Sequence, residues 1–381
     1  MLVRNGLVFT GGAFLRRDLR IADGVFCELA PAGRLTLADG EECVDADACY
    51  VLPGLVDVHS HGRAGEDFSF AGQEALRKLC RSYATCGVTS VLATTMTNEP
   101  TAIRNAMREI GSYRAKQKPD GARLLGIHME GPFLGKEKKG AHDERYLRPI
   151  EEAWFAQMQE ESRQSIRLVS LDPTLPGAEA WIGRCREQGI RISLAHTTCD
   201  YETAVRAVRA GADHVTHLFN AMNPLHHRKP GLIGAAFDCG LYTELICDGI
   251  HLHPAVIRMM FAMNPGKMIL ISDSMQAAGL PDGAYSLGGL SVQVSGGRAS
   301  LSDGTIAGST TDVFSAMVHA ISFGVPKEEA VLSASRIPAE SIGMEDRIGS
   351  IAEGLYADFL LTDKEFHLKE VCIRGEILSK L

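Results

Sequence analysis

The sequence predicts an α/β fold: a (β/α)8 TIM-like barrel with a small β-sandwich domain that is formed from both termini. From residue 53 onward, apolar strand candidates alternate with amphipathic helix candidates. Eight strands, each followed by a crossover, over roughly 300 residues suit a closed barrel. Residues 1–50 and the stretch after residue 352 instead show short strands separated by Gly, Asn and Asp, which indicates one shared β domain.

The predicted segments are residues 1–52 and 353–381 for the small domain and residues 53–352 for the barrel. A doubly wound sheet is the alternative, but no GxGxxG turn follows the first strand. The expected barrel strands are 55–59, 89–94, 124–128, 166–171, 190–196, 214–218, 241–247 and 268–272. The expected helices are 73–86, 101–116, 149–161, 177–188, 201–210, 254–263 and 313–323. Asp312 is expected to cap the last helix, and Met259, Met260 and Met263 to pack in the core.

Composition excludes several classes of function. The chain has 381 residues and a formal net charge of −8, with 45% hydrophobic and 23% charged residues, which is ordinary for a soluble globular protein. The acidic balance argues against general binding to nucleic acid or to an anionic membrane. We expect no signal peptide and no membrane span. Ten scattered cysteines without a CxxC pair indicate reduced thiols and a cytoplasmic location.

The barrel prediction is organised around residues 51–62, VLPGLVDVHSHG. The apolar run is typical of a strand buried on both faces, and His59 and His61 follow at its carboxyl end. Residues two apart on an extended backbone point the same way, so both imidazoles would project together. Two histidines aimed at one point are typical of a divalent metal site, although an isolated HxH also occurs in ordinary polar loops.

Four further barrel strands end in ionisable residues, where a barrel builds its active site. These residues are His128 and Glu130, His196, His217 and Asp273. A single histidine in an apolar strand is more often structural, but chance would not collect such groups at one end of five strands. We expect Glu130, His196 and His217 to bind one divalent ion, and His59 and His61 a second, with Glu130 bridging. These donors suit zinc, iron, manganese or cobalt, one or two ions per subunit.

Asp273, at the end of the last strand, is the candidate general base and acid. A bound metal acidifies water and polarises a carbonyl oxygen, but hydrolysis also needs a group that moves protons. A carboxylate here can take the proton of the water and return it to the leaving group. Its alternative role is to cap the turn that follows, and we favour the catalytic one.

The candidate substrate contacts lie in loops that follow the strands. The loop 220–231, NAMNPLHHRKPG, is a positively charged segment of an acidic chain. Arg228 in this loop can bind a phosphate group through two parallel hydrogen bonds. The amides near Asn220 and Ala221 can add donors, whereas Lys229 is expected to be solvated. The turn TIAGST, 305–310, allows close approach of the backbone to a ligand. Further polar candidates for sugar hydroxyls or an acyl oxygen are His142, Asp248, Gly249 and His251.

Together these motifs resemble the amidohydrolase superfamily, and within it the branch that deacetylates N-acetyl amino-sugar 6-phosphates. The motifs are PGLVDVHSHG, HMEGPF, KKGAHD, LAHTT, THLFNAM, HHRKPG, DGIH, ISDSM, TIAGST and EGLYADF, which span nearly the whole chain. The resemblance implies Glu130, His196 and His217 as ligands of the principal metal and Asp273 as the proton-handling residue. It implies substrate contacts at Ala141, His142, Asn220, Ala221, Asp248, Gly249, Ile250, His251, Ile306, Ala307 and Gly308.

The resemblance also implies a contact between subunits. The phosphate-binding arginine of the family falls on Arg228, and in relatives it reaches the site of the neighbouring subunit, so we expect a homodimer or a dimer-based tetramer. Some members lack the two histidines of the first strand and hold one metal, whereas His59 and His61 allow two here. Ser274 and Lys229 depart from the usual alanine and glutamate without removing a required group.

The expected reaction is hydrolysis of the acetamide of N-acetylglucosamine 6-phosphate to glucosamine 6-phosphate and acetate, in amino-sugar catabolism and cell-wall sugar recycling. His142 and the metal would polarise the acetyl carbonyl. The alternatives are the galactosamine epimer, or an amide without phosphate on the same machinery. An inactive barrel that serves as a scaffold or sugar-phosphate sensor is disfavoured, because every required group is present. No nucleic-acid or membrane partner is expected.

Overall fold

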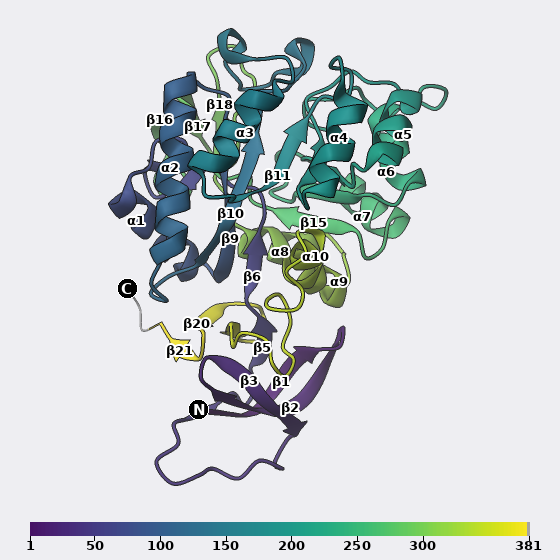
Figure 1. Cartoon of the computed structure of the whole chain (residues 1–381). Helices are drawn as coiled ribbons and strands as arrows, with labels where there is room; N and C mark the ends of the chain where they lie inside the picture. The colour runs from purple at the N-terminus through teal and green to yellow at the C-terminus, as the bar shows by residue number, and fades with distance from the viewer. Residues whose placement is uncertain (379–381) are drawn as a thin grey trace.

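The computed structural model describes residues 1–378, and its largest part is a barrel of eight parallel strands surrounded by helices (Figure 1). The strands follow one another around the barrel in chain order. They are β6 (Leu55–Asp57), β9 (Val88–Thr95), β10 (Arg123–Glu130), β11 (Ile166–Leu171), β12 (Arg191–Leu194), β13 (His214–Val215), β14 (Tyr242–Ile246) and β15 (Met268–Ile271). The predicted (β/α)8 fold is confirmed.

Helices cover the outside of the barrel, and local capping explains where some of them begin. The carboxylate of Asp312 accepts a hydrogen bond from the N–H of Ser315 at 2.8 Å, which is the predicted cap of α8. Asp200 caps α5 in the same way. The helices are α1 (Gln73–Thr85), α2 (Pro100–Lys116), α3 (Glu152–Glu161), α4 (Ala178–Glu187), α5 (Tyr201–Ala210), α6 (Gly231–Asp238), α7 (Pro254–Met263), α8 (Val313–Ser322), α9 (Lys327–Ala334) and α10 (Arg336–Ser341). Short 3₁₀ turns, Lys136–Lys138 and Glu144–Tyr146, follow β10.

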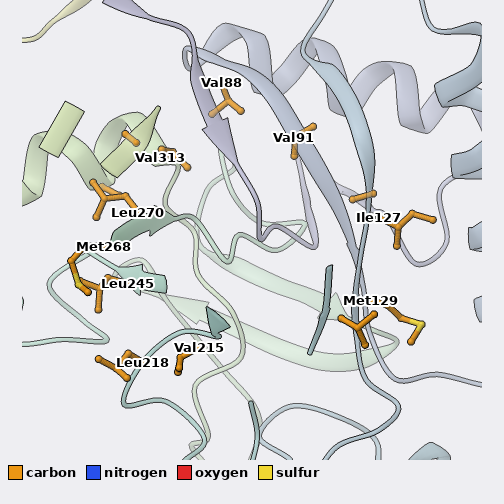
Figure 2. Close-up of a cluster of buried hydrophobic side chains, with 14 of the residues drawn as sticks. Val88, Val91, Ile127, Met129, Val215, Leu218, Leu245, Met268, Leu270 and Val313 are labelled. Atoms are coloured by element: carbon orange, nitrogen blue, oxygen red, sulfur yellow. The ribbon is translucent and has the colours of Figure 1, made fainter. Parts of the chain in front are cut away.

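Alternate residues of the barrel strands face the helices and the barrel interior, which is why apolar residues occur on both faces of the strands. In β15, Met268 and Leu270 belong to the layer between strands and helices, whereas Ile269 and Ile271 belong to the interior cluster. Figure 2 shows side chains of the outer layer, including Val313 of α8 near Leu270. Burial of each such side chain contributes about 1.5–3 kcal/mol, so both layers stabilise the barrel.

The first and last barrel strands are joined at the mouth by hydrogen bonds of Asp57 and His59. Asp57, the last residue of β6, accepts from the backbone N–H (3.3 Å) and the hydroxyl (2.6 Å) of Ser272, which follows β15. The N–H of Asp273 donates to the carbonyl of His59 at 2.9 Å. These bonds hold His59 and Asp273 beside each other.

A second sheet joins both ends of the chain and lies below the barrel in the view of Figure 1. Its strands run in the order β21-β20-β19-β5-β1-β2-β3, with β4 pairing β1 off this path. The antiparallel pair β5–β19 connects the two ends, with Val51 opposite Leu361. A separate apolar core that includes Val3, Val51 and Phe359 supports the sheet. The strands are β1 (Leu2–Thr10), β2 (Ala13–Ala22), β3 (Val25–Pro31), β4 (Cys43–Asp45), β5 (Tyr50–Pro53), β19 (Phe359–Thr362), β20 (Leu368–Ile373) and β21 (Glu376–Ile377).

Some elements were not predicted. A three-stranded antiparallel sheet, β16 (Gly283–Leu287), β17 (Leu290–Ser295) and β18 (Arg298–Ser300), lies between β15 and α8, and a short hairpin, β7 (Gly62–Arg63) and β8 (Glu66–Asp67), follows β6. The alternation in β17, LSVQVS, is a strand signal that the sequence does contain. Among the helices of residues 1–378, none is both long and apolar enough to cross a membrane.

The prediction that three methionines of α7 pack in the core is wrong for two of them. Met260 is buried, whereas Met259 and Met263 are 55% and 51% exposed. Residues 259 and 263 are one helical turn apart, so they share the face of α7 that points to solvent.

Candidate active site

A cavity of about 390 Å³ opens at the mouth of the barrel, where the carboxyl ends of the strands converge. The loops that follow the strands line it, together with Leu287 of β16. The predicted site residues on its wall are His61, Glu130, Ala141, His142, His196, His217, Asn220, Ala221, His251, Asp273, Ile306 and Gly308. Most of the predicted site residues therefore line one cavity.

Three donor atoms form a first cluster: Nε2 of His196, Nε2 of His217 and Oε1 of Glu130. Each lies 3.1 Å from the other two. The backbone φ angles of His196 and His217 are 44° and 28°, so the chain enters the left-handed region soon after β12 and β13 end. Such backbone strain collects at functional sites, and here it accompanies two side chains that turn into the mouth.

Four donor atoms form a second cluster that shares Glu130. Nε2 of His61 lies 3.2 Å from Oε2 of Glu130 and 3.1 Å from Oδ1 of Asp273. Nε2 of His59 lies 3.6 Å and 3.5 Å from the same two oxygens. Glu130 thus places one carboxylate oxygen in each cluster, which is the arrangement that a bridging ligand needs.

The distances in both clusters fit a divalent cation. Nitrogen and oxygen ligands at about 2.0–2.2 Å from a tetrahedral zinc ion lie about 3.3–3.6 Å from one another. Nε2 of His59 is buried and has no hydrogen-bond partner within the described chain, so its lone pair is free. Imidazole and carboxylate donors of this kind suit zinc, iron, manganese or cobalt.

Hydrogen bonds on the far side of two rings determine which nitrogen faces the clusters. Nδ1 of His196 donates to the carbonyl of Lys138 at 2.8 Å. Nδ1 of His59 donates to the carboxylate of Glu244, also at 2.8 Å. In the neutral form of each ring the proton is therefore on Nδ1, and Nε2 presents a lone pair to the cluster.

His142 has the opposite tautomer and is not a suitable ligand. Its Nδ1 accepts from the backbone N–H of Thr97 at 3.3 Å, so the proton of the neutral ring is on Nε2. Burial lowers the pKa of His142 to about 4, although Glu130 opposes the shift. The Nε2–H lies 3.4 Å from Oε2 of Glu130. His142 is therefore a neutral hydrogen-bond donor at neutral pH, even though it lies close enough to Glu130 and His196 to share an ion with them.

The buried carboxylates at the mouth of the barrel make it a favourable place for positive charge. Burial raises the pKa of Glu130, but the surrounding imidazoles, above all His59, lower it well below its usual range. Burial also raises the pKa of Asp273, whereas His59 and His61 lower it to about 2. Against burial, the same carboxylates raise the pKa of His61 to about 9. Both carboxylates are ionised at neutral pH, and a divalent cation would supply the charge that they favour.

Comparison with known proteins identifies the family. A model of the Amidohydrolase family matches residues 50–378, which include the whole barrel. This chain belongs to the amidohydrolase family. The resemblance inferred from the sequence motifs is confirmed.

Several relatives match this amidohydrolase over most of their length. N-acetylgalactosamine-6-phosphate deacetylase of Escherichia coli O157:H7 is 36% identical over 364 residues, which are 95% of this chain and 94% of the relative. N-acetylglucosamine-6-phosphate deacetylase of Bacillus subtilis (strain 168) is 38% identical over 332 residues, 86% and 84% of the two chains. The structure of N-acetyl-D-glucosamine-6-phosphate deacetylase from Mycobacterium smegmatis, in complex with N-acetyl-D-glucosamine-6-phosphate, has a TM-score of 0.93 and 29% identity, and the match covers 100% and 99%.

Other predicted contacts of this amidohydrolase lie outside the cavity wall. Asp248 accepts from Nδ1 of His251 at 2.7 Å and from the N–H groups of Ile250 and His251, so it orients the His251 ring. Gly249 belongs to the same turn, and Ile250 is 40% exposed. Ala307 is buried in a neighbouring apolar cluster. These four residues are not among those that line the cavity of this chain.

Arg228 lies on an exposed part of its loop, where its Nη1 is 2.6 Å from Nε2 of His227. It is not among the residues that line the cavity of its own chain. Lys138 is the one Lys or Arg side chain among the lining residues of the described chain.

Sequence reasoning missed Glu244, and it named His128 at a strand end without giving it a role. Glu244 lies on β14, and a carboxylate inside the apolar run TELIC is the signal that could have revealed it. His128 is a structural residue, because Nδ1 donates to the carbonyl of Val58 at 3.1 Å and Nε2 accepts from Ser170 at 2.8 Å. Both of its nitrogens are therefore occupied.

Proposed function

We propose that this amidohydrolase hydrolyses the acetamide of N-acetyl-D-glucosamine 6-phosphate to D-glucosamine 6-phosphate and acetate, in amino-sugar catabolism and cell-wall sugar recycling. The proposal depends on one observation: members of both donor clusters, the ionised Asp273 and the neutral His142 line the same cavity. Relatives named for this reaction match nearly the whole chain, which supports the proposal.

The proposed cation ligands are Glu130, His196 and His217 for the principal ion and His59 and His61 for a second, with Glu130 shared. A divalent cation held by these groups would acidify a bound water and polarise the acetyl carbonyl. The two clusters support one or two ions of zinc, iron, manganese or cobalt per subunit.

Asp273 and His142 are the proposed groups that act on the substrate. Asp273, ionised at neutral pH, accepts a proton from the attacking water and then donates it to the departing amine. His142 donates its Nε2–H to the acetyl oxygen, where negative charge develops as water attacks. The roles need no change in the protonation of His142, because its pKa lies far below neutral pH.

The phosphate group requires positive charge, and Lys138 is the one lysine or arginine among the lining residues of the described chain. We propose that Arg228 of a second subunit provides the rest, in a homodimer or a dimer-based tetramer. The exposed position of Arg228 supports this, because an exposed side chain that does not line its own cavity can bind in another. The remaining proposed substrate contacts are Ala141, Asn220, Ala221, Asp248, Gly249, Ile250, His251, Ile306, Ala307 and Gly308.

N-acetyl-D-galactosamine 6-phosphate is a second candidate substrate. The relative from Escherichia coli that is named for this sugar is 36% identical over 95% of the chain. The two sugars differ only in the orientation of one hydroxyl group, and the same acetamide would meet the same catalytic groups.

We place the reaction in the cytoplasm, because all ten cysteines are unpaired in the described chain.

Acetate release from three sugars tests the proposal. The purified protein, loaded with Zn²⁺ or Mn²⁺, is assayed with N-acetylglucosamine 6-phosphate, its galactosamine epimer and unphosphorylated N-acetylglucosamine. We expect kcat/KM to be highest for N-acetylglucosamine 6-phosphate and at least about a hundredfold lower without the phosphate, since a lost charged contact costs about 3 kcal/mol or more. Equal turnover of the unphosphorylated sugar would contradict the proposed substrate class.

A further inference from the structure

Glu244 of β14 is a fully buried carboxylate that touches both cation clusters from behind. Its Oε2 accepts a hydrogen bond from Nδ1 of His59 at 2.8 Å and another from the backbone N–H of His217 at 3.2 Å. The side chain is 0% exposed. Its Oε1 has no hydrogen-bond partner among the residues that the structure describes. An ionised carboxylate with one unpaired oxygen in such a place is unfavourable unless its charge is balanced nearby.

The bond from His59 to Glu244 determines how His59 faces the second cluster. With the proton held on Nδ1, the lone pair of Nε2 points toward Oε2 of Glu130 and Oδ1 of Asp273, at 3.6 Å and 3.5 Å. A carboxylate behind an imidazole also makes the other nitrogen a stronger donor to a cation. Without Glu244, the ring could turn or take its proton on Nε2, and the second cluster would lose one of its two imidazoles.

The charge balance of the mouth supports the same conclusion. Three carboxylates, Glu130, Asp273 and Glu244, are buried around the mouth. Within residues 1–378, every salt bridge formed by these three carboxylates is to a histidine. This concentration of buried carboxylates favours cations at the mouth.

Glu244 is not itself the centre of a third metal site. Glu244, His59 and His128 bring donor atoms within 4.8 Å of one another. Both nitrogens of His128 are occupied, however, by the carbonyl of Val58 and the hydroxyl of Ser170. Nδ1 of His59 carries a proton in its bond to Glu244. The group therefore offers too few free lone pairs to bind an ion.

We propose that Glu244 is a positioning residue that makes the second cation site, formed by His59, His61 and the shared Glu130, competent to bind. It acts through His59 and does not touch the substrate. The proposal rests on the proposed metal-dependent function, because it assumes that these clusters hold cations. Beyond that function, the proposal states that occupancy of the second cation site depends on Glu244, which is not a ligand of either cation.

The test is the number of Zn²⁺ ions bound by each variant, measured by elemental analysis after dialysis against a range of free Zn²⁺ concentrations. Glu244→Gln keeps the shape and can still accept a hydrogen bond, so it removes mainly the charge, while Glu244→Leu removes the acceptor as well. We expect wild type to bind two ions per subunit and Glu244→Gln to bind the second about 10–100-fold more weakly. Glu244→Leu should bind one ion at every concentration in the range. Co²⁺ absorption spectra of the same variants report whether the coordination of the second site is lost.

Asp213→Asn is the matched control. Asp213 accepts from Nδ1 of His214 at 2.6 Å, which is the same kind of carboxylate–histidine bond, next to β12 and away from the cavity. This variant should bind two ions as wild type does. His59→Ala should match Glu244→Leu, and the double variant should bind the second ion no more weakly than either single variant, because the two residues act as a unit.

Two results would overturn the proposal: wild type that binds a single ion at saturation, or Glu244→Gln and Glu244→Leu that both bind the second ion as tightly as wild type. Circular dichroism identifies a variant that has not folded, and such a variant would lose both ions rather than one. Acetate release measured on the same samples separates this proposal from the proposed reaction. Loss of the second ion without any deacetylation in wild type would leave Glu244 as a positioning residue and reject only the substrate.

Discussion

At the scale of single residues, the site is organised by which nitrogen of each imidazole carries the proton. His59 and His196 are bonded through Nδ1–H to Glu244 and to the carbonyl of Lys138, so each offers a lone pair at Nε2. His142 accepts at Nδ1 and offers Nε2–H instead. Of these three histidines, two can bind a cation through Nε2 and one can donate a hydrogen bond from Nε2. Their different hydrogen-bond partners at Nδ1 cause this difference.

Replacement of Asp273 tests the proton-transfer role. Asp273→Asn keeps the size of the side chain but cannot accept a proton from water at neutral pH. We expect kcat for acetate release to fall about 10²–10⁴-fold, with a much smaller change in KM. Steady-state kinetics at pH 7 measure both. Glu345→Gln, which removes an exposed carboxylate, is the control and should leave both constants unchanged. An Asp273→Asn variant with wild-type kcat would leave the proposed mechanism without its base.

The sequence could predict that His59, His61, Glu130, His196 and His217 converge, because parallel strands of a barrel bring their carboxyl ends together. It could not predict their tautomers, since these depend on backbone and side-chain partners from distant segments. Glu244 was missed for a related reason. It lies two residues before the end of β14, inside the barrel, and the search for residues at strand ends does not reach that position.

At the scale of elements, the turn 305–310 supports Asp273. The N–H of Ser309 donates to the carbonyl of Asp273 at 2.7 Å. The preceding residue, Gly308, has a φ of 63°. A Cβ on Gly308 would lie 3.1 Å from the carbonyl oxygen of Asp273. The turn thus needs glycine both for its backbone conformation and for the space beside Asp273.

The variant Gly308→Ala should therefore reduce activity as well as stability. We expect kcat to fall by about tenfold or more, because small displacements of a catalytic group are costly, and the melting temperature to fall with it. Gly304→Ala is the control: Gly304 has a φ of 86°, but a Cβ there would meet nothing within 4 Å. It should lower the melting temperature and leave kcat unchanged. Equal kcat values for the two variants would show that Gly308 does not support Asp273.

Strands and helices with long apolar patterns were the most predictable elements. The predicted strand 166–171 coincides with β11, Ile166–Leu171. β13 is shorter than predicted, His214–Val215, because the positive φ of His217 interrupts the extended backbone before the apolar run ends. Helices α9 and α10 escaped prediction since they follow directly on one another and show no single amphipathic period.

At the scale of the whole molecule, the cavity of one chain contains few basic side chains, and Arg228 is not among the residues that line it. Lys138 is the one Lys or Arg side chain that lines the cavity in the described chain, in a protein of net charge −8. A substrate with a phosphate group would gain from a further cation at the rim. A second copy of the chain is the proposed source.

Mixed dimers test whether Arg228 acts across the subunit interface. Two differently tagged chains, Arg228→Ala and Asp273→Asn, are expressed together, and the mixed dimer is purified through both tags. If Arg228 serves the neighbouring site, one site of the mixed dimer contains both groups and the dimer keeps about half of the wild-type activity. Each parent homodimer should be strongly impaired. A mixed dimer as inactive as its parents would show that Arg228 serves its own chain.

The small sheet has a consequence for how the protein is made. Its central pair, β5 and β19, joins residues near position 50 to residues near position 360, so the partner of β5 leaves the ribosome only after the whole barrel has been synthesised. Until then, the β5 edge and the apolar residues around Val51 on the nascent chain lack their cover. Long-range strand pairing of this kind forms late, and until it forms the unpaired strand edges are prone to aggregation. A ribosome stalled shortly before β19 would therefore release a chain with a barrel-forming segment and an open, aggregation-prone sheet.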